Sequence, residues 1–449
     1  MPKSSIPEKN NIDTNSYLLI DGERVGIDIT LLNKNSKMPI PVDNFVGLEI
    51  EENINSPFYK GVLKIKNDNN RFDLIGSDTP NFKIEYNFLE TGENFIVINL
   101  KRENKIKSYL LFVTEESNGI ENNIKVKTFF VENAYFYLLK NNKIPFSTTE
   151  LIKGDVTQLS DEQRQVNISN AIEKLLKNSI DEFIIDKDHW YLSKTKTNFS
   201  SSYNESALDS LNFLLDKALD NDDNFLFCLQ RDNVFSLWSI KDMYDSYLTR
   251  NYENNFGGNF LLVSEEMPEE SRKNVLTMRV TDYNLYNENP KHTLDNLVNH
   301  KVINYDFKGK KFNLLSKDNS LQNLKTYINK ELLNDNTIIN REENPKITNN
   351  TIYKPLYTTT SNIETARHEG RNIIFKNLIN LSTMLSFRSQ GVFEINTGNF
   401  INVTYQTENE NQRSNKLNGG WFVVGYKHTY TINSFSSEIV CTKFHELKL

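Results

Sequence analysis

The sequence predicts a mainly β protein with α+β insertions: two antiparallel β-barrel domains, a smaller α+β module and a helical insertion. Three observations predict this class. Short apolar runs that alternate with polar residues recur near both ends of the chain, and Asp-Gly, Asn-Gly and Thr-Gly turns accompany them. The chain has 28 Phe and 20 Tyr, and aromatic residues are enriched in strands. Apolar residues with helical spacing occur only in the middle and in one later part.

Length, charge and cysteine content limit the class further. A chain of 449 residues is too long for one ordinary core and suggests about three domains. The net charge of −7 without a basic stripe predicts no specific nucleic-acid partner. The polar start through Ser16 predicts no signal peptide, and no apolar run reaches the ~20 residues of a transmembrane segment. Cys228 and Cys441 are expected to be small buried hydrophobic residues in a protein made in the cytoplasm.

Residues 15–148 are predicted to form the first β-barrel domain, after a flexible N-terminus at 1–14. Asp21-Gly22 and Asn118-Gly119 each lie between apolar runs, which predicts two hairpin turns. The strands are expected at Tyr17–Ile20, Val25–Leu32, Phe45–Asp68 as a strand pair, Phe82–Tyr86, Phe95–Leu100, Tyr109–Val113 and Ile124–Val131. Short strands at near-regular spacing with turns between them are typical of a barrel or sandwich.

Residues 149–250 are predicted to form an α+β middle module. Apolar residues fall on one helical face at Ile168–Leu176 and again at Leu208–Leu219. Two apolar runs then predict a strand pair at Phe225–Leu229 and Val234–Ile240.

Residues 251–449 are predicted to form the second β-barrel domain, with a helical insertion at about 316–381. Helices are expected around Leu321–Leu332 and Ile363–Leu381, and the polar stretch Asn334–Thr360 between them predicts a long loop. Strands are expected at Val275–Val280, Val302–Phe307, Gly309–Phe312, Leu385–Arg388, Gly391–Ile395, Phe400–Tyr405, Trp421–Val424, Tyr426–Ile432 and Ser437–Phe444. No strict internal repeat relates the two β domains.

Several stretches, taken in their order and spacing, carry a resemblance to a known family. They are Ile50–Phe58 with Lys60–Ile65, Ser206–Leu215 with Phe225–Phe227 and Val234–Trp238, Asn304–Phe312, and Gly398–Val403 with Gly419–His428. The layout resembles the baseplate hub protein of contractile-tailed phages, a family that includes the base of type VI secretion spike proteins. The likeness runs from about residue 17 to residue 444.

The resemblance implies tail-tube-like barrels and a structural role without catalysis at the hub. Three copies would form a homotrimeric ring, in which two barrels from each copy make a pseudo-six-fold torus. One face would accept the six-fold tail tube protein and the other would hold the three-fold central spike protein. Other baseplate (wedge) proteins would be further partners, in a virion tail baseplate made from proteins synthesised in the host cytoplasm. A glycine-rich β-prism tail like that of type VI spike proteins is not found before Leu449, which favours a separate spike polypeptide.

The residues themselves predict no catalytic, cofactor-binding or metal site. None of the six His residues has metal-ligand spacing, and His368-Glu369 lacks the second His of the zinc-protease pattern. Asp220–Asn224 is similar to the start of a calcium loop, but Phe225 and Arg231 stand where that loop needs Gly and Glu. A solvated turn is therefore expected there.

Three groups of residues could serve either an interface or the fold. Glu49, Glu51 and Glu52 could form an acidic interface patch or the wet face of a strand. The helix around Leu208–Leu219 could dock a partner subunit or pack on its own sheet. His428, in the terminal hairpin, is expected to be packed or hydrogen-bonded.

Two other classes of function stay open. A receptor- or glycan-binding tail fibre or adhesin-type β protein would place its aromatic side chains in exposed grooves rather than at subunit contacts. A wall-degrading hydrolase would need two carboxylates at a defined separation. The chain has 59 acidic residues, so the sequence does not single out one such pair. The sequence has neither a nucleophile elbow nor a phosphate-binding glycine loop, so we expect no enzyme.

Overall fold

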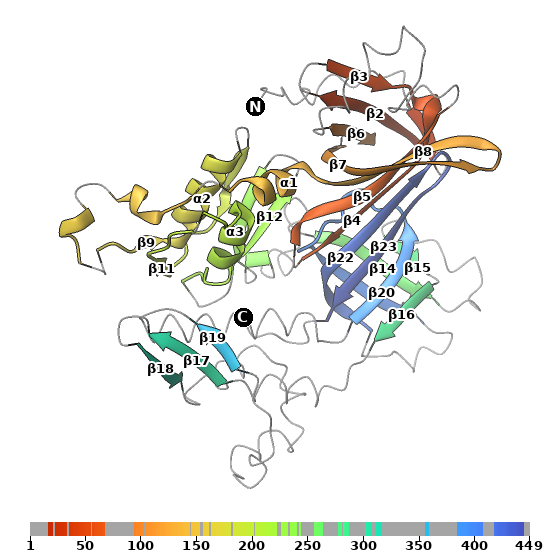
Figure 1. Ribbon diagram of the computed structural model, residues 1–449. Helices are drawn as coiled ribbons and strands as arrows, with labels where there is room; N and C mark the ends of the chain where they lie inside the picture. The colour runs from red at the N-terminus through yellow and green to blue at the C-terminus, as the bar shows by residue number, and fades with distance from the viewer. Residues whose placement is uncertain are drawn as a thin grey trace.

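The computed structural model describes the N-terminal part, the middle module and much of the C-terminal part (Figure 1). The described residues are 17–67 without 21–22, 34–35 and 55; 94–243 without 103–104, 144, 153–155, 161–162, 181–182, 202, 222–225, 232–233 and 240–241; and 256–263, 277–280, 282–286, 301–306, 310–315, 355–358, 384–406 and 417–443. The predictions of a flexible N-terminus at 1–14, a strand at Phe82–Tyr86 and helices at Leu321–Leu332 and Ile363–Leu381 concern residues outside these ranges.

The N-terminal part is an antiparallel, strongly curved sheet, as the alternating pattern predicts. Its strands are β1 (Tyr17–Ile20), β2 (Glu23–Asn33), β3 (Ser36–Ile40), β4 (Phe45–Asn53), β5 (Ser56–Lys66), β6 (Phe95–Arg102), β7 (Lys105–Glu121) and β8 (Ile124–Asn133), with a 3-10 turn at Val42–Asn44 before β4. They lie in the order β1-β2-β6-β7-β8-β5-β4, and β3 pairs with the far end of β2. The register of β1 and β2 closes a two-residue hairpin where Asp21-Gly22 predicts one.

The second predicted hairpin turn is displaced by four residues. Asn118 and Gly119 lie inside β7, paired with β8, and the turn falls at Asn122 and Asn123. Both of these residues have positive φ, 50° and 64°, a conformation that Asn tolerates better than most residues and that a two-residue hairpin requires. Since β6 pairs with β7 only as far as Phe112, the β7–β8 hairpin extends beyond β6 (Figure 1).

The C-terminal part continues the same sheet. Its strands are β14 (Phe256–Val263), β15 (Thr277–Val280), β16 (Asp282–Tyr286), β20 (Met384–Gln390), β21 (Phe400–Gln406), β22 (Gly419–Thr431) and β23 (Phe435–Thr442). Strand β14 is parallel to both β15 and β21, whereas the other pairs are antiparallel. The two expected strands around Gly425 are one strand, β22, whose register with β23 shifts between Val423 and Gly425.

Strand β22 also pairs with β4, so the two ends of the chain share one curled sheet. The register joins Gly425 to Asn53 and Thr431 to Gly47. Mainly antiparallel β structure is therefore confirmed. The division into two barrels stays a prediction, because the described strands of both parts form a single sheet of 15 strands.

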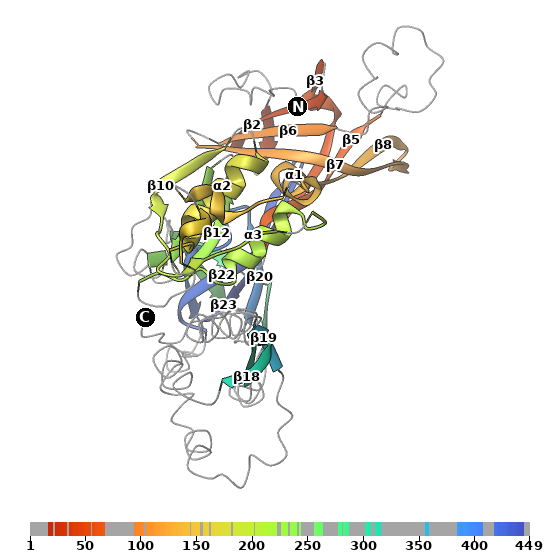
Figure 2. The ribbon, with the colours of Figure 1, turned by 60° about the vertical axis from the view of Figure 1, so that its left-hand side comes forward.

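The middle module lies beside β5, β7 and β8 (Figures 1 and 2). Helix α1 (Ala134–Asn141), near the end of the predicted domain 15–148, packs buried side chains into the core of the module. The elements of the module are 3-10 turns at Thr148–Leu151 and Val156–Gln158, β9 (Val166–Asn167), α2 (Ile168–Ser179), β10 (Ile184–Trp190), β11 (Lys196–Thr197), α3 (Ala207–Leu215), β12 (Leu226–Arg231) and β13 (Val234–Ser239). The predicted helices and strand pair are present. Helix α3 ends at Leu215, four residues early, and its Ser206 and Asp209 form a capping box. Helix α1, the short strands β9 and β11, and β10, which is parallel to β13, were not predicted.

Two expectations for the later part need correction. The loop predicted at Asn334–Thr360, inside the helical insertion predicted at 316–381, contains β19 (Pro355–Thr358). This strand pairs in parallel with β17 (Lys301–Asp306), which also pairs with β18 (Lys311–Leu315), and such long-range pairing overrides the local polar composition. The strand predicted at Gly391–Ile395 is irregular backbone, whose polar groups bond to strand ends and side chains as described below.

The largest hydrophobic core spans both halves of the sheet. It contains, for example, Leu48, Leu111, Phe387 and Trp421. The Trp421 indole nitrogen donates to the Leu417 carbonyl at 2.9 Å, so the side chain is buried without losing its hydrogen bond. A second core fills the middle module, and no described helix is long and apolar enough to cross a membrane.

Candidate functional site: a surface groove and an inner junction

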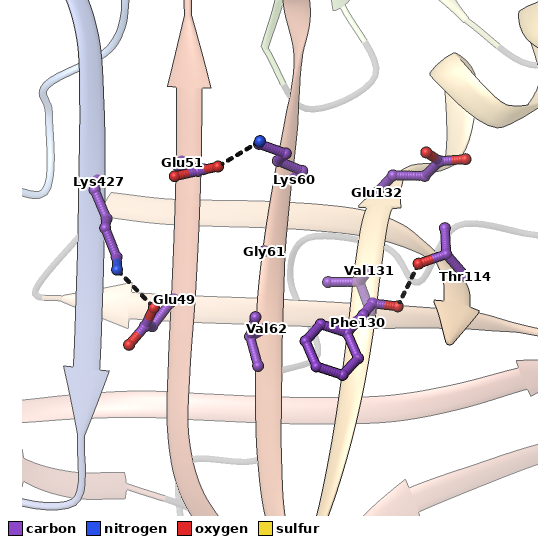
Figure 3. Close-up of a pocket in the computed structure, with 10 residues that line it drawn as sticks. All are labelled: Glu49, Glu51, Lys60, Gly61, Val62, Thr114, Phe130, Val131, Glu132 and Lys427. Carbon is purple, nitrogen blue, oxygen red and sulfur yellow. Dashed lines mark hydrogen bonds and ion pairs between the residues drawn. The ribbon is translucent and has the colours of Figure 1, made fainter. Parts of the chain in front are cut away.

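A shallow groove of about 310 Å³ lies on the outer face of the sheet (Figure 3). Five neighbouring strands line it, β22, β4, β5, β8 and β7. Glu51 pairs with Lys60 at 2.8 Å, and Glu49 pairs with Lys427 at 2.7 Å. Since each of these carboxylates faces water beside a lysine, the wet-face interpretation is confirmed for Glu49 and Glu51, and the face is not an acidic patch.

The centre of the groove is apolar. Phe130 is 39% exposed, and Val62 stands opposite it in the β5–β8 register (Figure 3). The floor is Gly61, where an added Cβ would lie 2.1 Å from the Glu49 carbonyl oxygen and 2.9 Å from a methyl group of Ile50. Only glycine lets β4 and β5 approach so closely. An apolar centre with a charged rim is the composition of a protein-contact surface.

Glu52 does not lie on the wet face of the strand, so the wet-face interpretation is wrong for this residue. It follows Leu48 and Ile50 on the inward face of β4 and is only 9% exposed. Its carboxylate accepts a hydrogen bond from the Thr397 hydroxyl, and Tyr426 also bonds to it. Burial raises the pKa of Glu52, although these two hydrogen bonds and the charge of Lys107 oppose that change.

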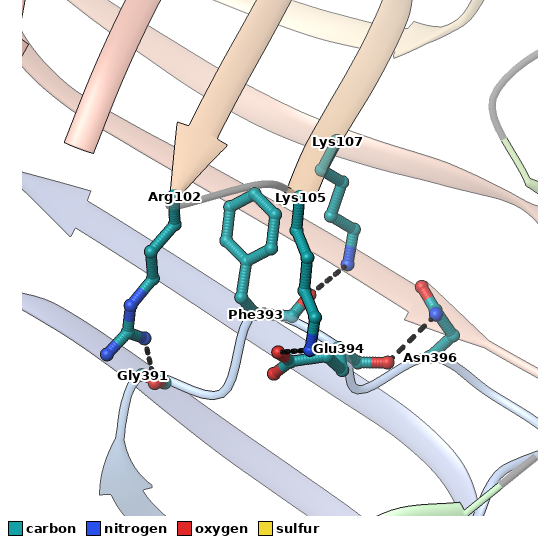
Figure 4. Close-up of polar contacts among 7 residues, drawn as sticks. All are labelled: Arg102, Lys105, Lys107, Gly391, Phe393, Glu394 and Asn396. Atoms are coloured by element: carbon teal, nitrogen blue, oxygen red, sulfur yellow. Dashed lines mark hydrogen bonds and ion pairs between the residues drawn. The ribbon is translucent and has the colours of Figure 1, made fainter. Parts of the chain in front are cut away.

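The inner junction is the place where the β6–β7 hairpin meets the irregular backbone at 391–397 (Figure 4). Arg102 donates to the Gly391 carbonyl at 3.4 Å, and Lys105 forms an ion pair with Glu394. Lys107 donates to the carbonyl oxygens of residues 393 and 395 at 3.4 and 3.2 Å. Three basic side chains from the N-terminal part therefore bind a C-terminal segment that lies about 290 residues away in sequence.

The pKa of Glu394 is lowered. Burial alone would raise it, but the hydrogen bond and the charge of Lys105 outweigh burial, and Arg102 adds to the same effect. Beside this pair, a half-open cavity of about 320 Å³ lies where the N-terminal part, the C-terminal part and the middle module converge. Glu52, Tyr109, Arg231 and Tyr426 are among its lining residues.

The middle module is attached by polar and aromatic contacts. Asn133 caps α1 through its side-chain oxygen and donates its amide to Gln230 of β12 at 2.6 Å. Phe58 of β5 packs against the Phe235 ring of β13, with ring centroids 6.5 Å apart. Helix α3 buries its apolar face inside the module, which confirms packing on its own sheet.

The remaining sequence candidates are placed as follows. His428 is fully buried and hydrogen-bonded, as predicted, and Cys228 and Cys441 are buried free thiols, as predicted. The prediction of a solvated turn at Asp220–Asn224 is wrong for Asp220. This residue is buried and accepts a hydrogen bond from the Ser239 hydroxyl at 2.6 Å. His368 lies outside the described residues, and among those described no three His, Cys, Asp or Glu residues are grouped to hold a metal.

Comparison with known proteins gives structural likenesses only. No protein-family model matches the chain, and no curated protein matches it. Similar solved structures are the tail protein from Neisseria meningitidis, with a TM-score of 0.49, 8% identity, and coverage of 94% of this chain and 99% of that chain; and the 43 kDa tail protein of prophage MuSo2 from Shewanella oneidensis, with a TM-score of 0.46, 8% identity, and coverage of 94% and 99%.

A third similar structure is a component of the type VI secretion system of E. coli, with a TM-score of 0.45, 8% identity, and coverage of 93% of this chain and 77% of that chain. It is itself described as similar to tail proteins of bacteriophage T4. These neighbours are described as two tail proteins, one of them from a prophage, and a component of a secretion system. At these TM-scores and identities, no residue role transfers to this chain.

Proposed function

We propose that this protein is a non-enzymatic, structural baseplate hub of a phage tail or a related contractile injection machine. The observation that carries the proposal is the single sheet shared by both ends of the chain, joined by β4 and β22 and fastened at the inner junction. A continuous sheet held at both ends suits a structural part, which needs no catalytic site. The sequence resemblance to hub proteins supports the same role.

We further propose the arrangement that the resemblance implies. Three copies form a ring with pseudo-six-fold symmetry, which joins a six-fold tail tube to a three-fold central spike and contacts baseplate wedge proteins. Within each copy the domains are 15–148, 149–250 and 251–449. The location is the virion tail baseplate, and synthesis takes place in the host cytoplasm.

The outer-face groove supports a subunit contact as part of this proposal. Its apolar centre, Val62 and Phe130, lies beside two ion pairs that form within one chain, Glu51 with Lys60 and Glu49 with Lys427. A second copy can therefore cover the apolar centre without breaking these two pairs. The projecting β7–β8 hairpin, with Ile120 73% exposed, is a further contact candidate.

The experiment is a mass measurement of the purified full chain by light scattering, followed by negative-stain imaging. We expect a particle of three times 52.3 kDa at micromolar concentration and a ring in the images. A strict monomer that also fails to bind tail tube and spike proteins would contradict the proposal. The mass of the particle and the binding of partners are measured separately. A monomer that binds both partners would therefore reject only the trimer.

The alternative function, a receptor- or glycan-binding adhesin, lacks a supporting observation among the described residues. The exposed aromatic side chains there are Tyr17, Phe130 and Tyr203, and they lie on β1, on β8 and in a loop before α3. A glycan groove needs aromatic faces gathered at one place.

A further inference from the structure

The fully buried imidazole of His428 lies against the lysine that crosses the inner junction. Its Nε2 is 3.4 Å from the Lys107 ammonium nitrogen, which also donates to the carbonyl oxygens of Phe393 and Ile395. An ammonium group has three donors and no acceptor. The contact is therefore favourable only when Nε2 carries a lone pair and the ring is neutral.

The other ring nitrogen completes this assignment. Nδ1 of His428 is 2.9 Å from the Ser437 hydroxyl oxygen, and the same oxygen accepts the backbone N–H of Val392 at 2.9 Å. With the ring proton on Nδ1, His428 donates to Ser437 and accepts from Lys107. The side chain thus links β7, β23 and the segment 391–397 through one tautomer.

The titratable and charged groups around the ring come from several elements. Lys107 approaches from β7, and the rings of Tyr426 and Tyr430 on β22 have centroids 4.4 and 6.1 Å from the imidazole. The ring centroid of Phe435 on β23 lies 5.4 Å from that of the imidazole, and Glu52 of β4 is hydrogen-bonded to Tyr426. The Lys105–Glu394 pair and Arg102 lie at the outer end of the junction.

Nε2 has a second possible partner. It is 3.4 Å from the Ile395 carbonyl oxygen, which already accepts a hydrogen bond from Lys107. A proton on Nε2 would turn the ring into a donor toward this carbonyl and bring two cations face to face. Lys107 and a protonated His428 therefore compete for one acceptor.

We propose that His428 is a proton-operated latch: the neutral ring holds Lys107 in the junction, and protonation of Nε2 expels Lys107 and loosens segment 391–397 from the β6–β7 hairpin. The latch does not depend on the proposed function. Burial, and then the charge of Lys107, lower the pKa of His428 well below 6.5, and the hydrogen bond that the protonated ring would donate to Ile395 opposes this. Because the folded pKa is lower than the unfolded one, the stability that His428 contributes is complete above pH 6.5 and is lost as pH falls below it.

The first test is a titration of the His428 ring by NMR, in the full chain with 13C-labelled histidine. His428→Gln identifies the signal. We expect the wild-type ring to stay in the Nδ1–H tautomer and to titrate well below 6.5. Lys107→Met should raise the midpoint toward 6.5, because it removes the adjacent charge. Lys105→Met is the matched control, since it changes a lysine two residues away on the same strand, and it should leave the midpoint unchanged.

The second test measures hydrogen exchange of the segment 391–397, corrected for intrinsic rates, against a peptide from α2. We expect protection of the segment to fall by up to tenfold per pH unit below 6.5 in the wild type, while α2 stays protected. In His428→Gln the pH dependence should shrink to less than twofold. A wild-type midpoint near 6.5, equal effects of the two lysine variants, or an unchanged pH dependence in His428→Gln would each overturn the latch. If His428→Gln does not fold, the comparison of Lys107→Met with Lys105→Met still tests the latch.

Discussion

Two polar regions flank the same strand, and they differ in burial rather than in composition. On the outer face of β4, Glu49 and Glu51 pair with lysines that water reaches freely, and Lys60 is 72% exposed (Figure 3). On the inner face, Glu52 is buried among Thr397, Tyr426 and the charge of Lys107. Adjacent residues on one strand therefore meet opposite environments, because side chains alternate between faces.

The difference decides what each region can do. Exposed ion pairs add little to folding and leave a surface free to meet another protein. Buried polar groups that are bonded across a junction specify one arrangement of the two ends, and they are costly to disturb. We therefore expect the junction to govern stability and the groove to govern association.

The largest effect is expected from Glu52→Ala. It removes the acceptor of the Thr397 hydroxyl and the partner of Tyr426, so buried groups lose their partners. We expect a loss of roughly 3–5 kcal/mol in the free energy of unfolding, measured by urea denaturation. Glu52→Gln keeps an acceptor oxygen and should cost much less. Equal losses in the two variants would show that the effect needs the carboxylate itself, and that a neutral acceptor oxygen cannot replace it.

The pH dependence of stability in Glu52→Gln also tests the difference in burial between the two faces of β4. The folded pKa of Glu52 is raised above its unfolded value of 4.5, so the folded state holds the proton longer. The corresponding stability is complete below pH 4.5 and is lost as pH rises through the folded pKa. The wild type should therefore lose stability relative to Glu52→Gln between acidic and neutral pH. A constant difference across this range would mean that Glu52 ionises without penalty.

The next effect is expected at the groove floor, where Gly61→Ala would bring a methyl group against the backbone of Glu49. Overpacking of this kind costs roughly 1–3 kcal/mol. The control is Gly119→Ala on β7, because no atom lies within 4 Å of its added Cβ. Thermal unfolding of both variants checks this, and similar melting temperatures would contradict the close approach of β4 and β5.

A smaller effect is expected from Glu394→Gln, which breaks the pair with Lys105 at the partly exposed end of the junction. Solvent screening limits the loss to below about 1 kcal/mol at neutral pH. Since the folded pKa of Glu394 is lowered, its stabilisation is present above pH 4.5 and disappears as pH falls through the folded pKa. The variant and the wild type should thus converge in acid, as measured by denaturation at pH 7 and below pH 4.

The sequence predicts local features of the groove and of the inner junction, but it does not predict which strands pair to form them. Alternation identifies β4 and the terminal strands, and the inward position of Glu52 follows from Leu48 and Ile50, although its charge obscured this signal. Strand β10 has the polar sequence Ile-Ile-Asp-Lys-Asp-His-Trp, so its pattern is weak. The β4–β22 pairing joins residues more than 370 positions apart, and no local propensity encodes such a register.

The junction was missed for the same reason. Lys107 looks like an ordinary wet-face lysine in its own strand, and Gly391–Ile395 looks like a strand because it is apolar and alternating. Only the fold brings the ammonium group to the carbonyl oxygens of Phe393 and Ile395. Buried polar contacts of this kind depend on three-dimensional neighbours, which composition and periodicity do not contain.

The smallest effect on stability, and the largest on association, is expected from Phe130→Ser in the groove. The side chain is already partly in water, so we expect a loss of at most about 1 kcal/mol in unfolding free energy. If a second copy covers the groove, the same change should weaken self-association at least tenfold in sedimentation analysis, because aromatic anchors dominate such contacts. Tyr203→Ser is the control, since Tyr203 is 81% exposed on the middle module, away from the groove. Equal association constants for the two variants would leave the groove without a role in assembly, while the inner junction would keep its role in folding.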